Sequence, residues 1–378
     1  MGNDDDSIVI LHKSPSPYRL PLFEKLADRY NLKIIFCTGR ESGRIWDTEP
    51  EAFDFESRVL DSKQIGPFIV SFGLLKALLE FDADTYLIGE DSSIVLSTIL
   101  TVFYAILTSS AIVFWVGDIP QNTVYKLSET KSFAMSCYRV FQRFYRRFLY
   151  KAASHFVAYS RLTEQYLSEC GVSRDKISIG GQVMPEENLP EPVSGKMSFD
   201  DDRPVVLALG YLEYRKGFDL LLGASERIVG KCDHQLVIAG DGEYRTELEE
   251  MASHMDHVQF TGYVEGGEKS TLYEQADIFV LPTRHDPWGL VVNEALYFDT
   301  PVITSSYAGV STLVKRDRCG TVITGDDEAE LRRQLERMLA GDMEKYRRNA
   351  EDSTRGHDLE GALELFEEAL EASSRNPQ

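Results

Sequence analysis

Compact apolar runs alternate with amphipathic stretches along the first half of the chain. Residues 7–13 ("SIVILHK") and 32–38 ("LKIIFCT") are mostly apolar, which is typical of buried strands. Between them, the stretch "LPLFEKLADRY" places Leu20, Phe23 and Leu26 at the spacing of one helix face. Because strand and helix patterns continue to alternate through this half, we expect a parallel sheet with helices on both faces.

A polar, proline-rich stretch over residues 185–204 interrupts this alternation and has the composition of a linker. The alternation starts again at Val205, and the chain closes with an amphipathic helix. We therefore predict the α/β class, with doubly wound, Rossmann-like domains over residues 1–190 and 200–355. A C-terminal helix within 356–378 can cross back to the first domain. In doubly wound sheets ligands bind beyond the carboxyl ends of the strands, so we expect a cleft between the domains.

Residues 92–117 carry no charge and are long enough to span a bilayer. However, polar residues 108–110 interrupt the segment, and the following run "AIVFWV" is short and rich in β-branched and aromatic residues. This pattern favours a buried helix followed by a buried parallel strand over a transmembrane span.

The chain has a formal net charge of -21, although its apolar and charged fractions are ordinary for a globular protein. An acidic surface repels phosphate backbones, so we do not expect nucleic acid as a partner. Aspartate runs and an excess of Arg over Lys suit a high-salt cytoplasm and suggest a halophile, because salt screens self-repulsion. The same composition fits an ordinary acidic cytosolic protein, and composition does not decide between the two.

The cysteines and the N-terminus indicate a cytoplasmic setting. The five cysteines are scattered, odd in number and without CxxC spacing, so we expect reduced thiols and neither a disulfide nor a zinc framework. The first residues, "MGNDDDS", are acidic and do not have the basic and apolar regions of a signal peptide.

Two loops of the second half carry candidate binding residues. In "LGYLEYRKGFDLL", Arg215 and Lys216 precede a glycine at the start of a helix, where two cations and free amides suit a diphosphate. An ordinary solvated Arg-Lys pair explains the same letters. In "IAGDGEY", Gly240 and Gly242 permit a tight turn and close approach of a ligand, although alone they signal only a turn.

The third loop is "LPTRHDPWGLVVNEALYF". Gly289 stands where a helix should begin, so the amides of Gly289, Leu290 and Val291 are expected to be free for an anion. Glu294 lies about one turn into that helix and can accept two hydrogen bonds from a diol such as ribose, while Asp286 can accept from sugar hydroxyls. The alternative is that both acids stabilise the helix dipole, by roughly 0.3 to 1 kcal/mol each.

The order and spacing of these loops resemble the family 4 glycosyltransferases, which have the GT-B fold of two facing Rossmann-like domains with a cleft between them. The resemblance covers nearly the whole chain and is strongest over residues 205–314. The matching pieces are "LGYLEYRKGFDLLLGA", "VIAGDGEYRTELE", "VQFTGYV", "LYEQADIFVLPT" and "DPWGLVVNEALYFDTPVI". The family's two acids, separated by seven residues, correspond here to Asp286 and Glu294.

The resemblance implies transfer of a hexosyl group from a UDP- or GDP-sugar to a glycan or lipid-linked glycan, with retention at the anomeric carbon. It implies no cofactor and no metal. Lys216 and Arg215 would hold the diphosphate and stabilise the leaving group, and the amides of residues 289–291 would bind the phosphates. Glu294 would bind the ribose and Asp286 the donor sugar.

The resemblance also gives a wider donor site and two further candidate contacts. Tyr263 would line the base pocket, and the glycines at positions 210, 240 and 242 would belong to the same site. Asp118 stands where many members carry a histidine after the fourth strand of the first domain, and it is a candidate contact to the sugar or the acceptor. His12 is a second candidate, although a lone histidine is more often structural.

Several positions depart from the family pattern. Asp286 replaces the usual glutamate and is one methylene shorter, and Tyr211 replaces the usual arginine, for which Arg215 could compensate. Asp299 and Thr312 stand where glycine and an acid are common. These departures place donor geometry in question.

A basic, aromatic helix is expected over residues 138–151, which suits an anionic membrane surface. Its aromatic side could equally belong to the core, with the arginines as a solvated face. The basic residues are Arg139, Arg143, Arg146, Arg147 and Lys151, interleaved with Phe141, Phe144, Tyr145 and Phe148.

Three hypotheses follow for the function. The first is a retaining glycosyltransferase that is cytoplasmic or peripheral at the inner membrane face. The second is a non-catalytic GT-B subunit, which the Tyr211 and Asp286 departures favour, and the third is a sugar-nucleotide epimerase of the same fold. An NAD-binding enzyme is not expected, because "HKSPSPYRL" follows the first strand in place of a GxGxxG turn.

Overall fold

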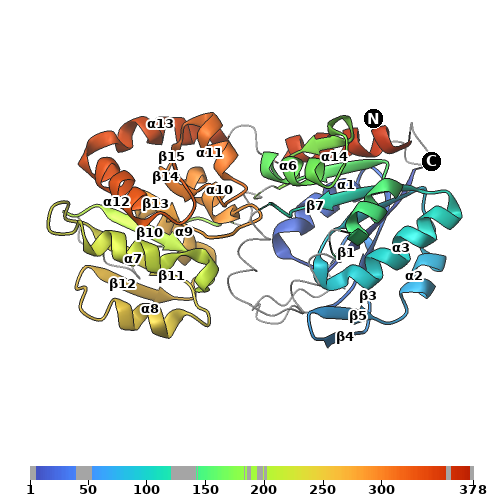
Figure 1. Cartoon of the computed structure of the whole chain (residues 1–378), viewed down its shortest axis with the longest axis horizontal. Coiled ribbons are helices and arrows are strands. Elements are labelled where there is room, and N and C mark those ends of the chain that lie inside the picture. The colour runs from blue at the N-terminus through green and yellow to red at the C-terminus, as the bar shows by residue number, and fades with distance from the viewer. Residues whose placement is uncertain are drawn as a thin grey trace. The chain divides into compact units, whose positions relative to one another are not determined.

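The structure is a computed structural model that describes residues 6–39, 53–120, 142, 144–182, 184, 189–193, 199, 202–354 and 359–374. These residues form two compact units. The first unit holds the described residues up to Val183 together with the C-terminal helix, and the second holds those from Met184 to Asp358. Each unit is built on one parallel sheet flanked by helices, as Figure 1 shows.

The first unit has a seven-stranded sheet in the order β3-β2-β1-β6-β7-β8-β9, and all its pairings are parallel. An antiparallel hairpin, β4-β5, stands apart from it. The strands are β1 (Ser7–His12), β2 (Asn31–Phe36), β3 (Glu56–Val59), β4 (Ser62–Ile65), β5 (Phe68–Ser71), β6 (Thr85–Gly89), β7 (Ala111–Val116), β8 (His155–Ala158) and β9 (Ile177–Ile179). The helices are α1 (Leu20–Ala27), α2 (Leu74–Glu80), α3 (Val95–Thr108), α6 (Arg161–Glu169) and α14 (Leu359–Ser374).

Apolar side chains alternate between the two faces of this sheet and fill a core on each. One core lies against α2 and α3, and the other lies against α1 and α14. The C-terminal helix, red in Figure 1, is therefore part of the first unit, and the ring centroid of its Phe366 lies 4.9 Å from that of Trp115 on β7. The apolar stripe of the C-terminal segment is explained by this contact.

The charge-free segment forms a helix, α3, followed by a fully buried strand, β7, which confirms the expected pair of elements. Strand β7 is apolar throughout because both of its faces are covered, as is usual in a parallel sheet. Within the described part of the chain, none of the helices combines the length and apolarity that crossing a membrane requires.

The second unit has a six-stranded parallel sheet in the order β12-β11-β10-β13-β14-β15. Strand β10 lies between β11 and β13, so the strand order reverses there, and such a switch point is where doubly wound sheets bind ligands. The strands are β10 (Val205–Leu209), β11 (Gln235–Ala239), β12 (Val258–Gly262), β13 (Ile278–Leu281), β14 (Val302–Ser305) and β15 (Gly320–Ile323). The helices are α7 (Phe218–Glu226), α8 (Arg245–Met251), α9 (Gly266–Gln275), α10 (Leu290–Tyr297), α11 (Ser311–Asp317), α12 (Glu328–Arg337) and α13 (Met343–Thr354).

Part of the expected linker is attached to the second unit. The Val193 backbone N–H donates to the Thr271 hydroxyl oxygen at 3.0 Å, and that hydroxyl donates to the Val193 carbonyl at 3.1 Å. Leu189 is buried. Composition alone does not reveal this anchoring, because it depends on one threonine in α9.

Candidate active site

The loops after β10 and β13 meet at the switch point of the second unit. The Arg284 N–H and the Thr283 hydroxyl both donate to the Arg215 carbonyl oxygen, at 2.7 and 2.8 Å. Gly217 has φ of 72°, and a Cβ there would lie 2.2 Å from the Pro282 carbonyl oxygen. The glycine after Lys216 is therefore needed because the two loops pass in contact.

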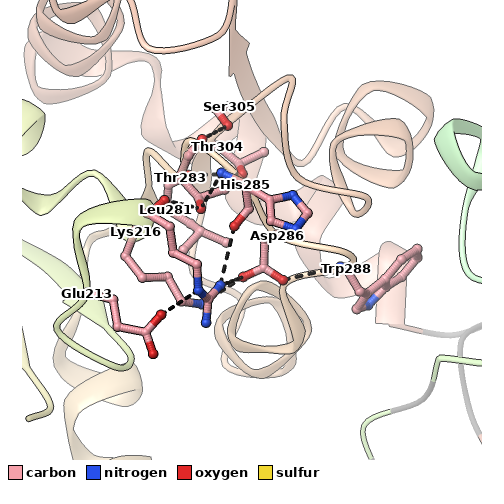
Figure 2. A network of polar contacts seen from close by, with 10 residues as sticks. Glu213, Lys216, Leu281, Thr283, His285, Asp286, Trp288, Thr304 and Ser305 are labelled. Carbon is pink, nitrogen blue, oxygen red and sulfur yellow. Dashed lines mark hydrogen bonds and ion pairs between the residues drawn. The ribbon is translucent and has the colours of Figure 1, made fainter. Parts of the chain in front are cut away.

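This contact brings together two candidate residues, Lys216 and Asp286. The Lys216 Nζ lies 2.7 Å from Asp286 Oδ2, and both residues are buried, each 8% exposed (Figure 2). Arg215 lies beside the pair, with its Nη1 3.9 Å from the same oxygen and its Nε donating to Glu213 Oε2 at 2.5 Å. The site thus holds two cations around one buried carboxylate.

Charge and burial oppose each other in this pair. Burial raises the pKa of Asp286, but the Lys216 and Arg215 charges outweigh burial and lower it to about 2. Burial lowers the pKa of Lys216, and the Asp286 carboxylate opposes that shift. The lowered pKa of Asp286 favours its charged form, whereas the lowered pKa of Lys216 favours its neutral form. The short contact between opposite charges decides in favour of the ionised pair.

The backbone around Asp286 fixes its carboxylate. The Asp286 N–H donates to the Tyr307 carbonyl at 3.1 Å, and the Gly309 N–H donates to the Asp286 carbonyl at 3.0 Å. The Trp288 N–H donates to Asp286 Oδ1 at 3.2 Å, as Figure 2 shows. The carboxylate is therefore held from both loops before any ligand binds.

Helix α10 begins directly after Gly289, as expected. Gly289 has φ of 101°, and a Cβ there would lie 2.8 Å from Leu281 Cδ2, so this position requires glycine. Leu290 and Val291 occupy the first turn, whose amides have no acceptor within the helix. The geometry leaves these amides at the switch point, beside the Asp286 loop.

Glu294, also on α10, is held by two side chains of α9. Its Oε1 lies 3.0 Å from Lys269 Nζ, and its Oε2 accepts from the Tyr273 hydroxyl at 2.7 Å. Burial and the Glu294 charge raise the pKa of Tyr273 well above its usual range. Neither partner was predicted from the sequence, although Lys269 and Tyr273 stand four apart and so share one helix face.

Gly240 and Gly242 face protein backbone. A Cβ on Gly240 would lie 1.9 Å from the Gly210 carbonyl oxygen, and one on Gly242 would lie 2.5 Å from the Leu212 carbonyl oxygen. A Cβ on Gly210 itself would lie 3.8 Å from Lys216 Cε. These glycines let the loops after β10 and β11 pack closely. The side chain of Lys216 passes next to Gly210 in this packed backbone.

Tyr263 and Arg284 complete the surroundings. Tyr263 is 47% exposed, and its hydroxyl donates to Glu265 Oε2 at 3.1 Å. Arg284 makes a bidentate contact with Asp219, at 2.7 Å for each nitrogen, and lies over the Tyr214 ring. Arg284 was not predicted as a site residue, because its bond to a residue 65 positions away leaves no local sequence pattern.

Asp118 belongs to the first unit, whereas the residues above belong to the second. Its carboxylate pairs with Arg146, which also binds Glu90 at 2.5 Å and donates to the Tyr166 hydroxyl at 2.6 Å. Arg146 is buried, so the expectation that it belongs to an exposed basic face is wrong. Its ion pairs with Asp118 and Glu90 compensate the cost of burying its charge.

The rest of the basic, aromatic segment has exposed and buried aromatic side chains. Residues 144–149 are helical, with Phe144 and Phe148 76% and 62% exposed and Tyr145 buried. Arg139, Phe141 and Arg143 lie outside the described residues.

No group of three potential metal-ligating side chains occurs among the described residues. The cysteines in that part of the chain are free.

Residues 192–356 match the family described as "Glycosyl transferases group 1". Similar curated proteins include an uncharacterised glycosyltransferase of Methanocaldococcus jannaschii, 32% identical over 143 residues, which are 37% of each chain. Another is the alpha-monoglucosyldiacylglycerol synthase of Streptococcus pneumoniae, 30% identical over 147 residues, 38% of this chain and 33% of that one. The chain thus spans about a third of the length of these curated relatives, 37% and 33%.

Solved structures match over nearly the whole chain. Anabaena HepE in complex with UDP and glucose has a TM-score of 0.70 at 15% identity, covering 97% of this chain and all of that one. Sucrose-phosphate synthase of Thermosynechococcus elongatus has a TM-score of 0.72 at 17% identity, with the same coverage. The chain therefore has the GT-B fold and has homologues among GT-B glycosyltransferases, and its residues 192–356 match the glycosyl transferases group 1.

Proposed function

We propose that this chain is a retaining glycosyltransferase of family 4. It transfers a hexosyl group from a UDP- or GDP-sugar to a glycan or lipid-linked glycan. The observation that carries the proposal is the buried Lys216–Asp286 pair at the switch point, with Arg215 beside it. Structural ion pairs seldom lie buried next to a second cation at a ligand-binding edge, because desolvation makes such an arrangement costly.

The arrangement fits the chemistry of a diphosphate leaving group. As the bond between the anomeric carbon and the phosphate oxygen breaks, negative charge grows on that oxygen. Lys216 and Arg215 supply fixed positive charge there, and the first-turn amides of α10 add hydrogen-bond donors. Asp286 remains ionised, because its pKa is about 2, and can accept from hydroxyls of the donor sugar.

Glu294 suits the ribose of the donor. Its carboxylate is oriented by Lys269 and Tyr273, so its remaining lone pairs can accept from a diol without reorganisation. This orientation also gives Glu294 a role in joining α9 to α10, and the test below separates that role from binding.

The comparisons support a nucleotide sugar and a lipid-linked acceptor. HepE is described in complex with UDP and glucose. A relative from Mycolicibacterium smegmatis, 34% identical over 137 residues, is described as a GDP-mannose-dependent phosphatidylinositol monomannoside mannosyltransferase. Exposed Phe144 and Phe148, four residues apart on one helix, are one described feature that suits a peripheral position at the inner membrane face.

Thermal unfolding with a panel of nucleotides and nucleotide sugars tests the proposal. A ligand at 100 times its dissociation constant adds about 2.7 kcal/mol of stability. UDP or GDP and one matching sugar should stabilise the wild type and Glu274→Gln, an exposed control on α9, but not Glu294→Gln. No response to any nucleotide from a folded protein would overturn the proposal and favour the non-catalytic subunit. Stabilisation followed by epimerised free sugar would favour the epimerase.

A further inference from the structure

Arg19 lies at the carboxyl edge of the first sheet, in the loop between β1 and α1. Its guanidinium carbon sits 4.1 Å above the Trp115 ring. Its Nη1 lies 2.8 Å from His12 Nε2, and its Nη2 donates to the Tyr159 hydroxyl. The adjacent Tyr18 contacts Arg19 as well, with its ring centroid 5.5 Å from the guanidinium carbon. The other partners come from the ends of β1, β7 and β8, which are neighbours or near neighbours in the sheet.

The acceptors of Arg19 are neutral. His12 Nδ1 lies 2.9 Å from the Ser14 carbonyl oxygen, so Nδ1 carries the proton and Nε2 accepts from Arg19. Burial, reinforced by the Arg19 charge, lowers the pKa of His12 to about 3. His12 is therefore uncharged at neutral pH and adds no positive charge to the cluster.

The positive charge of Arg19 has no counter-charge in contact. Among the described residues, no carboxylate forms an ion pair with Arg19, and its buried Nε–H has no acceptor. The Asp91 carboxylate is paired with Lys13 at 3.3 Å. Buried charges in proteins are normally paired, because removing an ion from water is costly, and aromatic rings supply only part of that compensation.

The sheet is adapted to this cluster by two glycines. A Cβ on Gly89, at the end of β6, would lie 2.8 Å from His12 Cδ2. A Cβ on Gly117, just after β7, would lie 2.5 Å from Tyr159 Cε2. Any larger residue at either position would displace a ring that holds Arg19, so the orientation of Arg19 is built into the strand ends.

We infer that Arg19 is the centre of an oxyanion-binding site in the first unit, which takes a carboxylate or phosphate group of a ligand. Within the described part of the chain the Nε–H of the guanidinium has no acceptor, and a carboxylate or phosphate is the group that accepts from a guanidinium and supplies the missing charge. The site lies in the first unit and shares no residue with the Lys216–Asp286 pair. If the ligand is the sugar acceptor, which rests on the proposed function, that acceptor carries an acidic group.

Nuclear magnetic resonance of arginine side chains tests the inference directly. The full chain, labelled with ¹⁵N-arginine, is titrated at constant ionic strength with inorganic phosphate, glucuronate and, as a neutral control, glucose. The Arg19 Nε–H signal, identified by its loss in Arg19→Lys, should shift saturably with the anions and not with glucose. Phosphate and glucuronate distinguish a phosphorylated ligand from an acidic sugar.

Two comparisons make the result decisive. The apparent dissociation constant, measured in all variants by isothermal titration calorimetry because Arg19→Gln lacks the Arg19 signal, should rise at least about tenfold in Arg19→Gln. It should not change in Arg161→Gln, an arginine with a 72% exposed side chain in the same unit. No saturable shift with either anion in the folded wild type would overturn the inference. Because the titration needs neither donor nor turnover, failure of the proposed transferase activity would leave its outcome unaffected.

Discussion

The ammonium of Lys216 lies 2.7 Å from the carboxylate of Asp286, although 70 residues separate them in the chain. Strands β10 and β13 are neighbours in the sheet, so the loops that follow them end at the same edge. The pair is buried and carries Arg215 at its side. This relationship joins the two sequence signals that independently suggested phosphate and sugar binding.

Replacing Lys216 separates the catalytic from the structural value of the pair. We expect Lys216→Ala to lower turnover at least about 100-fold, because charge on the leaving group loses its main stabilisation. Leaving Asp286 buried without its closest partner should also cost about 3–5 kcal/mol of stability. Urea titrations should show that the variant is still folded. Lys231→Ala is the control, because Lys231 pairs with Glu336 while its side chain is 73% exposed. An undiminished turnover in Lys216→Ala would exclude the leaving-group role.

The pKa of Asp286 predicts a loss of stability in acid. Burial raises this pKa, but Lys216 and Arg215 outweigh burial and lower it from 3.8 to about 2. Between these values the unfolded chain binds the proton and the folded chain does not. The free energy of unfolding should therefore fall by about 2 kcal/mol as the pH falls through this range. Urea midpoints should show this component in the wild type and not in Asp286→Asn; equal pH dependence in both would contradict the assignment.

Gly240 should be the least tolerant of the loop glycines. A Cβ there would lie 1.9 Å from the Gly210 carbonyl oxygen, and its φ of 132° is unfavourable for other residues. We expect Gly240→Ala to destabilise the protein by more than about 2 kcal/mol. Gly230→Ala, where a Cβ meets nothing within 4 Å, should be nearly neutral in the same thermal assay. Similar stability of the two variants would show that the close packing of these loops is dispensable.

Much of the fold follows from the sequence pattern because its signals are local. Each signal spans a short segment of the sequence, as in the apolar runs of β1 and β10 and the periodic apolar stripe of α14. The site divides differently. Gly289 at the start of α10 is a local signal and was predicted. The side chains that bind Asp118 and Glu294 come from other helical segments, so they were not predicted. Arg146 shows the limit most clearly, since its inward orientation depends on Glu90, 56 residues earlier.

The exposed phenylalanines predict membrane binding by the first unit. Phe144→Ser and Phe148→Ser should each lower partition onto vesicles of phosphatidylglycerol and phosphatidylcholine by about tenfold, since each loses the burial of one aromatic side chain. Phe72→Ser, 55% exposed elsewhere in the same unit, serves as the matched control. Cosedimentation that is unchanged in both helix variants would show that this surface does not contact lipid.

Cleavage of the donor tests the central claim most directly. The protein is incubated with the nucleotide sugar that stabilises it, and ³¹P NMR follows release of the nucleoside diphosphate, while early anomeric proton signals report the configuration of the released or transferred sugar. The account predicts release by the wild type, retention at the anomeric carbon, and a rate at least about 100-fold lower in Lys216→Ala. The same incubation is repeated with membranes that contain the acceptor. If the donor binds but stays intact there, the result contradicts the account and identifies a sugar-binding subunit instead.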